Sequence, residues 1–458
     1  MEYDRDPSGQ EDNAMDVDNN DMIVWRCIQR EPNNGASDDT TEAEISTVEF
    51  SEDGEMLAIG DKMGRISILK RDHDYNSDGA RSSQYAVYST FQSHEPEFDY
   101  LKSLEIEEKI NQVKWMKKKS SSDFILSTND KTIKLWKISE RQRQIAQGNY
   151  NIEEVDGVKR RINNGLVLPK LEPMELLVEA SPRRVYSNAH VYHINSISIN
   201  SDQETFISAD DLRINLWNHE ITNQCFTIVD IKPVNMEELT EVITTAEFHP
   251  TAEQLFCYGS SKGLSKICDT RENALCDRPA KVFHARDDAR NFFSELIASV
   301  SDIKFSHSGR YLLTRDYLSA YVWDLAMETQ PVEVYNVHDY LRNKLCQLYE
   351  NDCIFDKFQA QWSGDDDHIL TGSYNNFFRT FRRSNSWDTT YEAIEPFYAR
   401  RAGPAGDATV NERRRPNEIN VDRMDFDRKI LHSSWNPNSN VISLSSGSYL
   451  YIFEGEKA

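Results

Sequence analysis

One segment of the sequence places many carboxylates among apolar side chains, a combination suited to binding a basic peptide. Residues 93–110 (SHEPEFDYLKSLEIEEKI) set six acids against two lysines, with Phe98 and Tyr100 among them. Such a segment would bind a basic peptide by charge attraction and by contacts to a few apolar side chains. A solvated acidic loop without a ligand is the alternative interpretation.

Two later segments repeat this combination with helical spacing. Residues 235–242 (NMEELTEV) predict a short helix with Asn235 as its N-cap and Glu238 as its capping-box partner. Met236, Leu239 and Val242 would lie along one face of that helix. Residues 339–358 (DYLRNKLCQLYENDCIFDKF) place leucines at helical intervals. For this third segment, a helix packed on a core is the alternative.

Motifs for catalysis or metal binding do not occur in the sequence. It contains no GxSxG, GxxxxGK[ST], strand-associated GxGxxG or HExxH pattern. His190 and His193 stand three residues apart, a spacing that does not put both on one face of a strand. We therefore interpret these histidines as structural or loop residues. The sequence predicts a binding protein, not an enzyme, with no cofactor and no metal.

Composition narrows the class of protein and of partner. The 458 residues carry 52 basic and 76 acidic side chains, a net charge of −24, which argues against nucleic-acid binding and favours basic partners. Seven cysteines without a CxxC pair fit a reducing compartment. No stretch has the roughly 20 apolar residues of a membrane span. We expect a cytoplasmic protein that can also enter the nucleus, with residues 1–21 as a disordered acidic leader.

The elements that position the acidic segments are predicted from internal repeats. Large residues that close alternating strands recur in two columns. Within the seven successive repeats, the first-column residue and the second-column residue are 19, 21, 18, 20, 18, 19 and 18 positions apart. The first column is Phe50, Trp115, Ile199, Phe248, Phe305, Trp362 and Trp435. The second column is Leu69, Trp136, Trp217, Cys268, Trp323, Phe381 and Phe453.

This repetition predicts an all-β fold, a seven-bladed β-propeller of WD-repeat type. Trp136, Trp217 and Trp323 stand in near-matches to the ending of a WD repeat. Only five residues follow Phe453, too few for the outer strand of the last blade. We expect residues 22–28 to supply that strand, so that residues 22–458 form a single propeller.

The insertions between repeats indicate where recognition takes place. The three acidic segments precede the first strands of blades two, four and six, so they should open on one face of the disc. Asp211, in a turn of blade three, should open on the same face, although a turn-stabilising role is the alternative. The long insertion after Trp136 predicts a protruding hairpin arm at about 140–177, with a disordered loop as its alternative. Residues 399–420 predict a flexible basic loop.

Long motifs extend this interpretation to a family. STVEFSEDGE, HINSISINSD, SADDLRINLW, NMEELTEVIT and LYENDCIFDKF closely resemble the WD-repeat regulatory B subunit of protein phosphatase 2A, and the match runs from about Ile45 to Phe453. The resemblance implies a non-catalytic subunit of a heterotrimeric serine/threonine phosphatase. Its arm would dock on the HEAT-repeat scaffold subunit, which also carries the catalytic subunit.

The resemblance also implies the residues of both binding surfaces. An acidic groove would receive phosphoprotein substrates with basic segments, often cell-cycle targets of cyclin-dependent kinases, and mitotic inhibitor proteins. Its residues would be Phe98, Asp99, Ser103, Glu105, Glu107, Tyr192, His193, Asp211, Met236, Leu239, Val242, Tyr349, Glu350, Asp352, Phe355 and Lys357. The scaffold-binding arm would use Glu140, Arg141, Tyr150, Glu153, Glu154, Asp156 and Leu177.

Two other classes of protein are the alternatives. A generic WD-repeat adaptor, such as a ubiquitin-ligase substrate receptor, would lack the arm and the long motifs. A propeller enzyme would place several buried ionisable residues at the central channel, a pattern that the repeats do not show.

Overall fold

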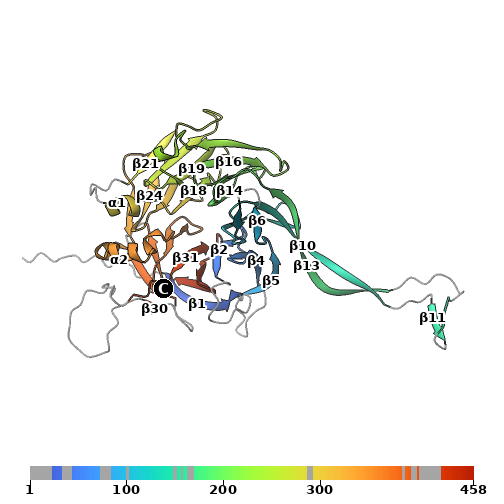
Figure 1. Ribbon diagram of the computed structural model, residues 1–458. Helices are drawn as coiled ribbons and strands as arrows, with labels where there is room; N and C mark the ends of the chain where they lie inside the picture. Colours follow the sequence, from blue (N-terminus) through green and yellow to red (C-terminus); the bar gives the residue numbers. More distant parts are fainter. Residues whose placement is uncertain are drawn as a thin grey trace, which may run out of the picture.

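Seven antiparallel sheets surround a common centre, six of them with four strands and one with five (Figure 1). The computed structural model describes residues 23–33, 44–72, 84–99, 103–147, 152–155, 158–161, 170–285, 292–383, 387–393, 400–401 and 424–457. The predicted seven-bladed propeller is confirmed. The predicted leader, residues 1–21, lies outside the described residues.

The first three blades follow one another in chain order. Blade one contains β2 (Ile45–Phe50), β3 (Met56–Asp61), β4 (Arg65–Arg71) and β5 (Tyr85–Gln92). Blade two contains β8 (Gln112–Trp115), β9 (Asp123–Thr128), β10 (Ile133–Gln147) and β13 (Lys170–Tyr186). Blade three contains β14 (Ser196–Ile199), β15 (Thr205–Ala209), β16 (Arg213–Asn218) and β17 (Cys225–Asp230).

The remaining blades complete the ring. Blade four contains β18 (Ile243–Phe248), β19 (Leu255–Ser260), β20 (Leu264–Asp269) and β21 (Lys281–His284). Blade five contains β22 (Asp302–Phe305), β23 (Tyr311–Arg315), β24 (Ser319–Asp324) and β25 (Glu333–Asn336). Blade six contains β26 (Ala360–Trp362), β27 (His368–Gly372), β28 (Phe377–Arg382), β29 (Trp387–Glu392) and β30 (Arg400–Arg401). Blade seven contains β31 (Ile430–Trp435), β32 (Val441–Ser446), β33 (Tyr449–Lys457) and β1 (Ile23–Pro32).

This topology sorts the loops onto two faces. The first strands of the blades contact one another around the centre, as β2 does with β8 and β31. Because neighbouring strands are antiparallel, the turn between the second and third strands shares a side with the connection to the next blade. We call this side the upper face, and the opposite side the lower face.

Both columns of large residues fulfil the role that their spacing predicts. All seven residues of the second column are buried between blades. Trp217, for example, packs against Tyr186 and Phe206, with ring centroids 5.5 Å and 6.1 Å away. The first column ends at the lower face, where all seven of its residues line a cavity of about 340 Å³. Aromatic burial between blades therefore holds the ring together.

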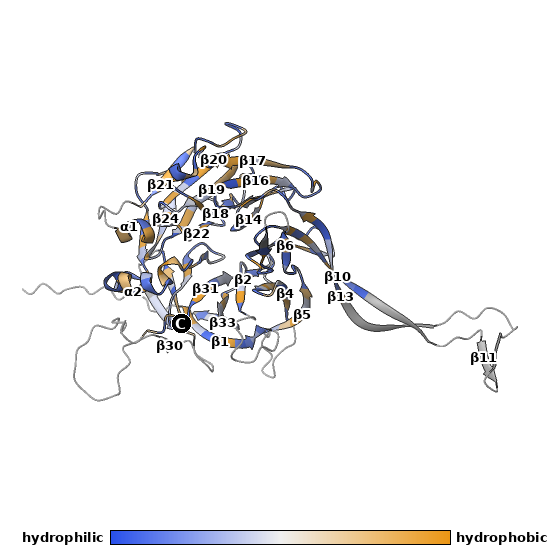
Figure 2. Ribbon diagram, in the orientation of Figure 1, coloured by the Kyte–Doolittle hydropathy of each residue, from blue (hydrophilic) through white to orange (hydrophobic). Residues whose placement is uncertain are grey.

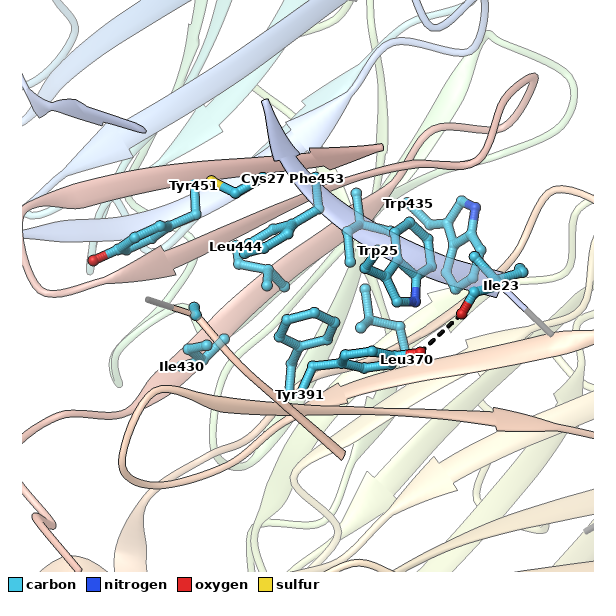
Figure 3. Packing of buried hydrophobic residues seen from close by; sticks show 13 residues of the cluster. Ile23, Trp25, Cys27, Leu370, Tyr391, Ile430, Trp435, Leu444, Tyr451 and Phe453 are labelled. Carbon is cyan, nitrogen blue, oxygen red and sulfur yellow. Dashed lines mark hydrogen bonds between the residues drawn. The ribbon is translucent and has the colours of Figure 1, made fainter. Parts of the chain in front are cut away.

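The last blade joins the two ends of the described chain. Strand β1 pairs with β33 from Ile23 opposite Lys457 to Pro32 opposite Tyr449. Figure 3 shows Trp25 inserted beside Trp435, with ring centroids 5.2 Å apart. The expected strand at 22–28 thus begins at Ile23 and continues to Pro32. This pairing covers the edge of β33 and closes the ring.

One short strand falls within the predicted loop at 399–420. Arg400 and Arg401 pair with Glu392 and Tyr391 and form the fifth strand of blade six. Backbone pairing with β29 therefore fixes two residues of the predicted flexible loop at 399–420. Residues 402–423 lie outside the described part of the chain.

Candidate functional site

The first acidic segment forms a small hairpin on the upper face. Strands β6 (Glu97–Asp99) and β7 (Leu104–Ile106) pair, and Ser103 adopts a left-handed φ of 51° in the turn between them. Phe98 is 43% exposed, and Ser103, Glu105 and Glu107 are also exposed. The predicted combination of exposed carboxylates and an apolar anchor is therefore present on this hairpin.

A cavity of about 850 Å³ lies between this hairpin, the upper turn of blade two and the connection from blade two to blade three. Glu95, Glu97 and Asp99 line one side, and Lys131 and Lys134 line another. Burial lowers the pKa of Lys134, and the charges of Glu95 and Glu97 oppose that shift. The cavity therefore combines an acidic side, a basic side and the apolar surface of Phe98.

The second segment differs from its predicted helix. Only η4 (Met236–Glu238), a 3₁₀ turn, forms, and the Asn235 side chain accepts from the backbone N–H of Glu237. Leu239 is already extended, so Met236, Leu239 and Val242 do not share a helix face. The segment is too short to propagate a helix between two fixed strands. Met236 nevertheless remains 43% exposed on the upper face.

The third segment divides into a packed face and an exposed face. It contains η5 (Asp339–Lys344), α2 (Leu345–Glu350) and η6 (Cys353–Phe355). Leu341 and Leu348 are buried in the core, as the packed-helix alternative predicts. Tyr349 and Phe355 are 41% and 54% exposed, with ring centroids 6.0 Å apart. Glu350 and Asp352 are exposed beside them.

One neighbouring element was missed by the sequence reasoning. The short helix α1 (Phe292–Ile297), hydrophobic in Figure 2, places Phe292 with its ring centroid 5.6 Å from that of Tyr349. Phe292 is 64% exposed. The adjacent Phe292 and Phe293 were the sequence signal for this exposed aromatic surface. Two adjacent phenylalanines outside a strand cannot both be buried easily.

Asp210, not Asp211, stabilises the turn of blade three. Asp210 is buried, and its Oδ1 accepts from the backbone N–H groups of Leu212 and Arg213 at 2.8 Å and 2.7 Å. Its Oδ2 lies 2.9 Å from Nδ1 of His190. Ser208 Oγ lies 2.6 Å from His190 Nε2 and accepts from Trp217 Nε1 at 2.9 Å. The turn-stabilising alternative for Asp211 is therefore wrong, and the structural interpretation of His190 is confirmed.

Asp211 is consequently available on the upper face. It is half-buried, and burial raises its pKa while the positive charge of Lys357 opposes that rise. Partial desolvation lowers the pKa of Lys357, and Asp211 opposes that shift in turn. These side chains come from blade three and from the connection into blade six. The two charges therefore influence each other across the upper face.

Tyr192 and His193 lie between these regions, on the connection from blade two to blade three. Tyr192 is half-buried, whereas the His193 side chain is 73% exposed. Its Nδ1 lies 3.3 Å from Oδ2 of Asp130, in the upper turn of blade two. Chain topology thus places all the predicted substrate-binding residues on the upper face.

The predicted arm is an extension of blade two. Strands β10 and β13 stay paired as far as Gln147 and Lys170, and together they project far from the disc (Figure 1). Between them, β11 (Ile152–Val155) pairs with β12 (Val158–Arg161). Tyr150 and Asp156 lie outside the described residues. The backbones of Glu153 and Glu154 lie in β11, and that of Leu177 lies in β13.

Comparison with known proteins decides the family. The chain is 57% identical over 468 residues to the serine/threonine-protein phosphatase 2A regulatory subunit sur-6 of Caenorhabditis elegans, covering 99% of this chain and 94% of that protein. The chain belongs to the regulatory B subunits of protein phosphatase 2A. It is therefore a regulatory subunit and not a catalytic one. This family membership rules out the two alternatives, a generic WD-repeat adaptor and a propeller enzyme.

Two further comparisons concern the fold of this B subunit. The family model "WD domain, G-beta repeat" matches residues 181–218, which contain the network of His190, Ser208, Asp210 and Trp217. The crystal structure of Chaetomium thermophilum Raptor superposes with a TM-score of 0.56 at 14% identity, covering 95% of this chain and 30% of that one. This likeness shows the fold alone.

Neither a membrane-spanning helix nor a cluster of metal ligands occurs among the described residues of this B subunit. No helix there has the length and apolar character of a membrane span. No group of three or more His, Cys, Asp or Glu side chains there is arranged to hold a metal ion.

Proposed function

We propose that this B subunit selects substrates for protein phosphatase 2A with its upper face and joins the enzyme with its arm. The arm of β10 and β13 binds the HEAT-repeat scaffold subunit, which also carries the catalytic subunit. The upper face holds the basic segments of phosphoproteins, cell-cycle substrates among them, and also accepts mitotic inhibitor proteins. The subunit works in the cytoplasm and in the nucleus.

One observation carries this proposal: exposed acidic and apolar residues gather on the upper face, where the turn of blade three is held by the side chain of Asp210 and not by that of Asp211. A basic segment attracted there would gain charge complementarity, with Phe98, Met236 and Phe355 as apolar anchors. The net charge of −24 would also attract a basic substrate from a distance while it diffuses toward the protein. Such attraction weakens with salt, because exposed charges are screened beyond about 8 Å at physiological ionic strength.

The B subunit would speed dephosphorylation by raising the local concentration of the substrate. The catalytic subunit supplies the chemistry, and this B subunit holds the substrate near it. Tethering through a short flexible segment raises the concentration of the phosphosite at the catalytic subunit to about the millimolar range. Substrates without a basic segment do not gain this advantage.

The substitution Asp211→Lys tests the upper-face proposal. In a trimer assembled from purified subunits, it should lower kcat/KM toward a basic phosphoprotein by at least about tenfold, since the attraction becomes repulsion beside Lys357. Activity toward a short neutral phosphopeptide should not change. The matched charge reversal Glu272→Lys, at an exposed position on the lower face, should leave both activities near wild type.

The outcome depends on Asp211→Lys leaving the fold intact. Asp210 provides the hydrogen bonds of the turn, so the variant should unfold with a wild-type midpoint and assemble normally. Unchanged kcat/KM toward the basic substrate in such a trimer would refute substrate capture at Asp211.

A further inference from the structure

The arm loses its sheet neighbour soon after it leaves blade two. Strand β10 pairs with β9 only as far as Ile138 opposite Asp123, whereas its pairing with β13 continues to Gln147. Beyond Ile138 the arm is therefore a two-stranded ribbon. An isolated ribbon is marginally stable and twists readily, so its direction depends on what holds its base.

Blade one contacts this base through a polar cluster. The hydroxyl of Tyr88, on β5, donates to Oε1 of Glu140 at 2.8 Å, and Nζ of Lys70, on β4, donates to the same oxygen at 3.2 Å. The Lys70 ammonium also lies 4.9 Å from the centroid of the Tyr88 ring. Glu140 is the second residue beyond the end of the β9 pairing. We call Lys70, Tyr88 and Glu140 the brace.

Apolar packing beside the brace holds the same strands together. The partly buried Tyr88 packs on the core cluster that contains Trp136 and Ile138 of β10. Val178 and Ala180 of β13 pack on the same cluster. Strand β5 also contacts β13 directly, and Figure 1 shows β5 beside the base of the arm. Both strands of the ribbon are thus held against blade one.

The protonation states favour a strong hydrogen bond in the brace. Hydrogen bonds from Tyr88 and Lys70 lower the pKa of Glu140, so its carboxylate stays ionised at neutral pH. Burial, followed by the neighbouring Glu140, raises the pKa of Tyr88, so its hydroxyl remains a donor. Hydrogen bonds to an ionised acceptor are shorter and stronger than neutral ones. Beside the brace, Arg141 Nε pairs with Glu179 Oε2 at 2.8 Å and links the two arm strands.

We propose that the brace fixes the direction in which the arm leaves the propeller. Glu140 is then a positioning residue that acts inside this chain, instead of a residue that contacts the scaffold. An arm held in its binding direction loses less freedom on association, which raises affinity without any added contact. This inference rests on the proposed docking of the arm on the scaffold subunit.

The variant Tyr88→Phe tests the brace because it removes one oxygen and keeps the ring. Its dissociation constant for purified scaffold subunit should rise about 5- to 10-fold, as expected for losing a hydrogen bond to a charged group. The matched control is Tyr321→Phe on blade five, where the hydroxyl donates to Oδ2 of Asp316 at 3.0 Å. That control should change scaffold affinity by less than about twofold.

A second measurement reports the direction of the arm without the scaffold. Nitroxide labels at Gln144→Cys on β10 and Glu272→Cys on blade four, with exposed Cys346 replaced by serine, give a distance distribution by pulsed electron spin resonance. The distribution should be narrow in the labelled parent and clearly broader after Tyr88→Phe. It should not broaden after Tyr321→Phe.

The possible outcomes separate the two proposals. Weaker scaffold binding with an unchanged distance distribution would overturn the brace, because Tyr88 and Glu140 would then act by direct contact. An unchanged distribution together with unchanged affinity would overturn it as well. If the parent protein does not bind the scaffold, arm docking is refuted, while the width of the distribution still decides whether the brace exists. The double variant Tyr88→Phe/Glu140→Gln should bind no more than about twofold more weakly than Tyr88→Phe alone.

Discussion

Replacing residues 144–173 with a short Gly-Ser turn should abolish binding to the scaffold subunit and leave the propeller folded. The deleted part lies beyond the pairing of β10 with β9, so blade two keeps its four strands and the brace keeps Glu140. We expect the dissociation constant to rise at least about 100-fold, roughly 2.7 kcal/mol. Isothermal titration with purified scaffold subunit measures this change.

The control for arm removal is the stability of the remaining propeller. Its thermal unfolding midpoint should stay within about 2 °C of wild type, because none of the buried clusters between blades in the described part of the chain includes a residue from 144–173. Scaffold binding of wild-type strength by the armless variant would show that the disc itself carries the interface. The proposed division of labour between arm and upper face would then be wrong.

The largest effect on stability is expected at the closing strand. Trp25 is fully buried against Trp435 in a cluster that also contains Phe453, and β1 covers the edge of β33. We expect Trp25→Ala to lower the free energy of unfolding by about 3–5 kcal/mol, the usual range for a buried aromatic residue. Deleting β1 altogether should cause aggregation, since it exposes a paired edge and an apolar cluster together.

The neighbouring residue supplies a matched control. Val24 lies in the same strand with its side chain 44% exposed, so Val24→Ala should change the free energy of unfolding by less than about 0.5 kcal/mol. Urea unfolding followed by tryptophan fluorescence measures both variants. Equal midpoints for Trp25→Ala and wild type would contradict closure of the ring by β1.

The repeating part of the fold was predictable because it is encoded locally. Alternating residues between two anchor columns specify strand, turn and burial within about 20 residues, and burial of all seven second-column residues follows from that pattern. The upper-face position of the acidic segments follows from antiparallel order. The isolated run at 22–28 was assignable because the last repeat lacks an outer strand, although the pairing continues to Pro32.

Other features depend on contacts that the local sequence does not specify. Whether Asp210 or Asp211 faces inward is decided by His190, twenty residues away. The predicted helix after Asn235 is limited to one turn by the fixed strands on either side. Glu140 was predicted as an arm residue, but its partners Tyr88 and Lys70 were not predictable, because they belong to another blade, 52 and 70 residues away. Such pairings form only when neighbouring blades pack against each other.

Cross-linking of the assembled trimer with a bound basic substrate tests the central claim most directly. Lysine-reactive cross-links from the scaffold should fall on arm residues such as Lys159 and Lys170, and those from the substrate on upper-face residues such as Lys109, Lys131 and Lys262. Substrate cross-links to Lys117 and Lys118, in the lower turn of blade two, with none on the upper face would contradict the account.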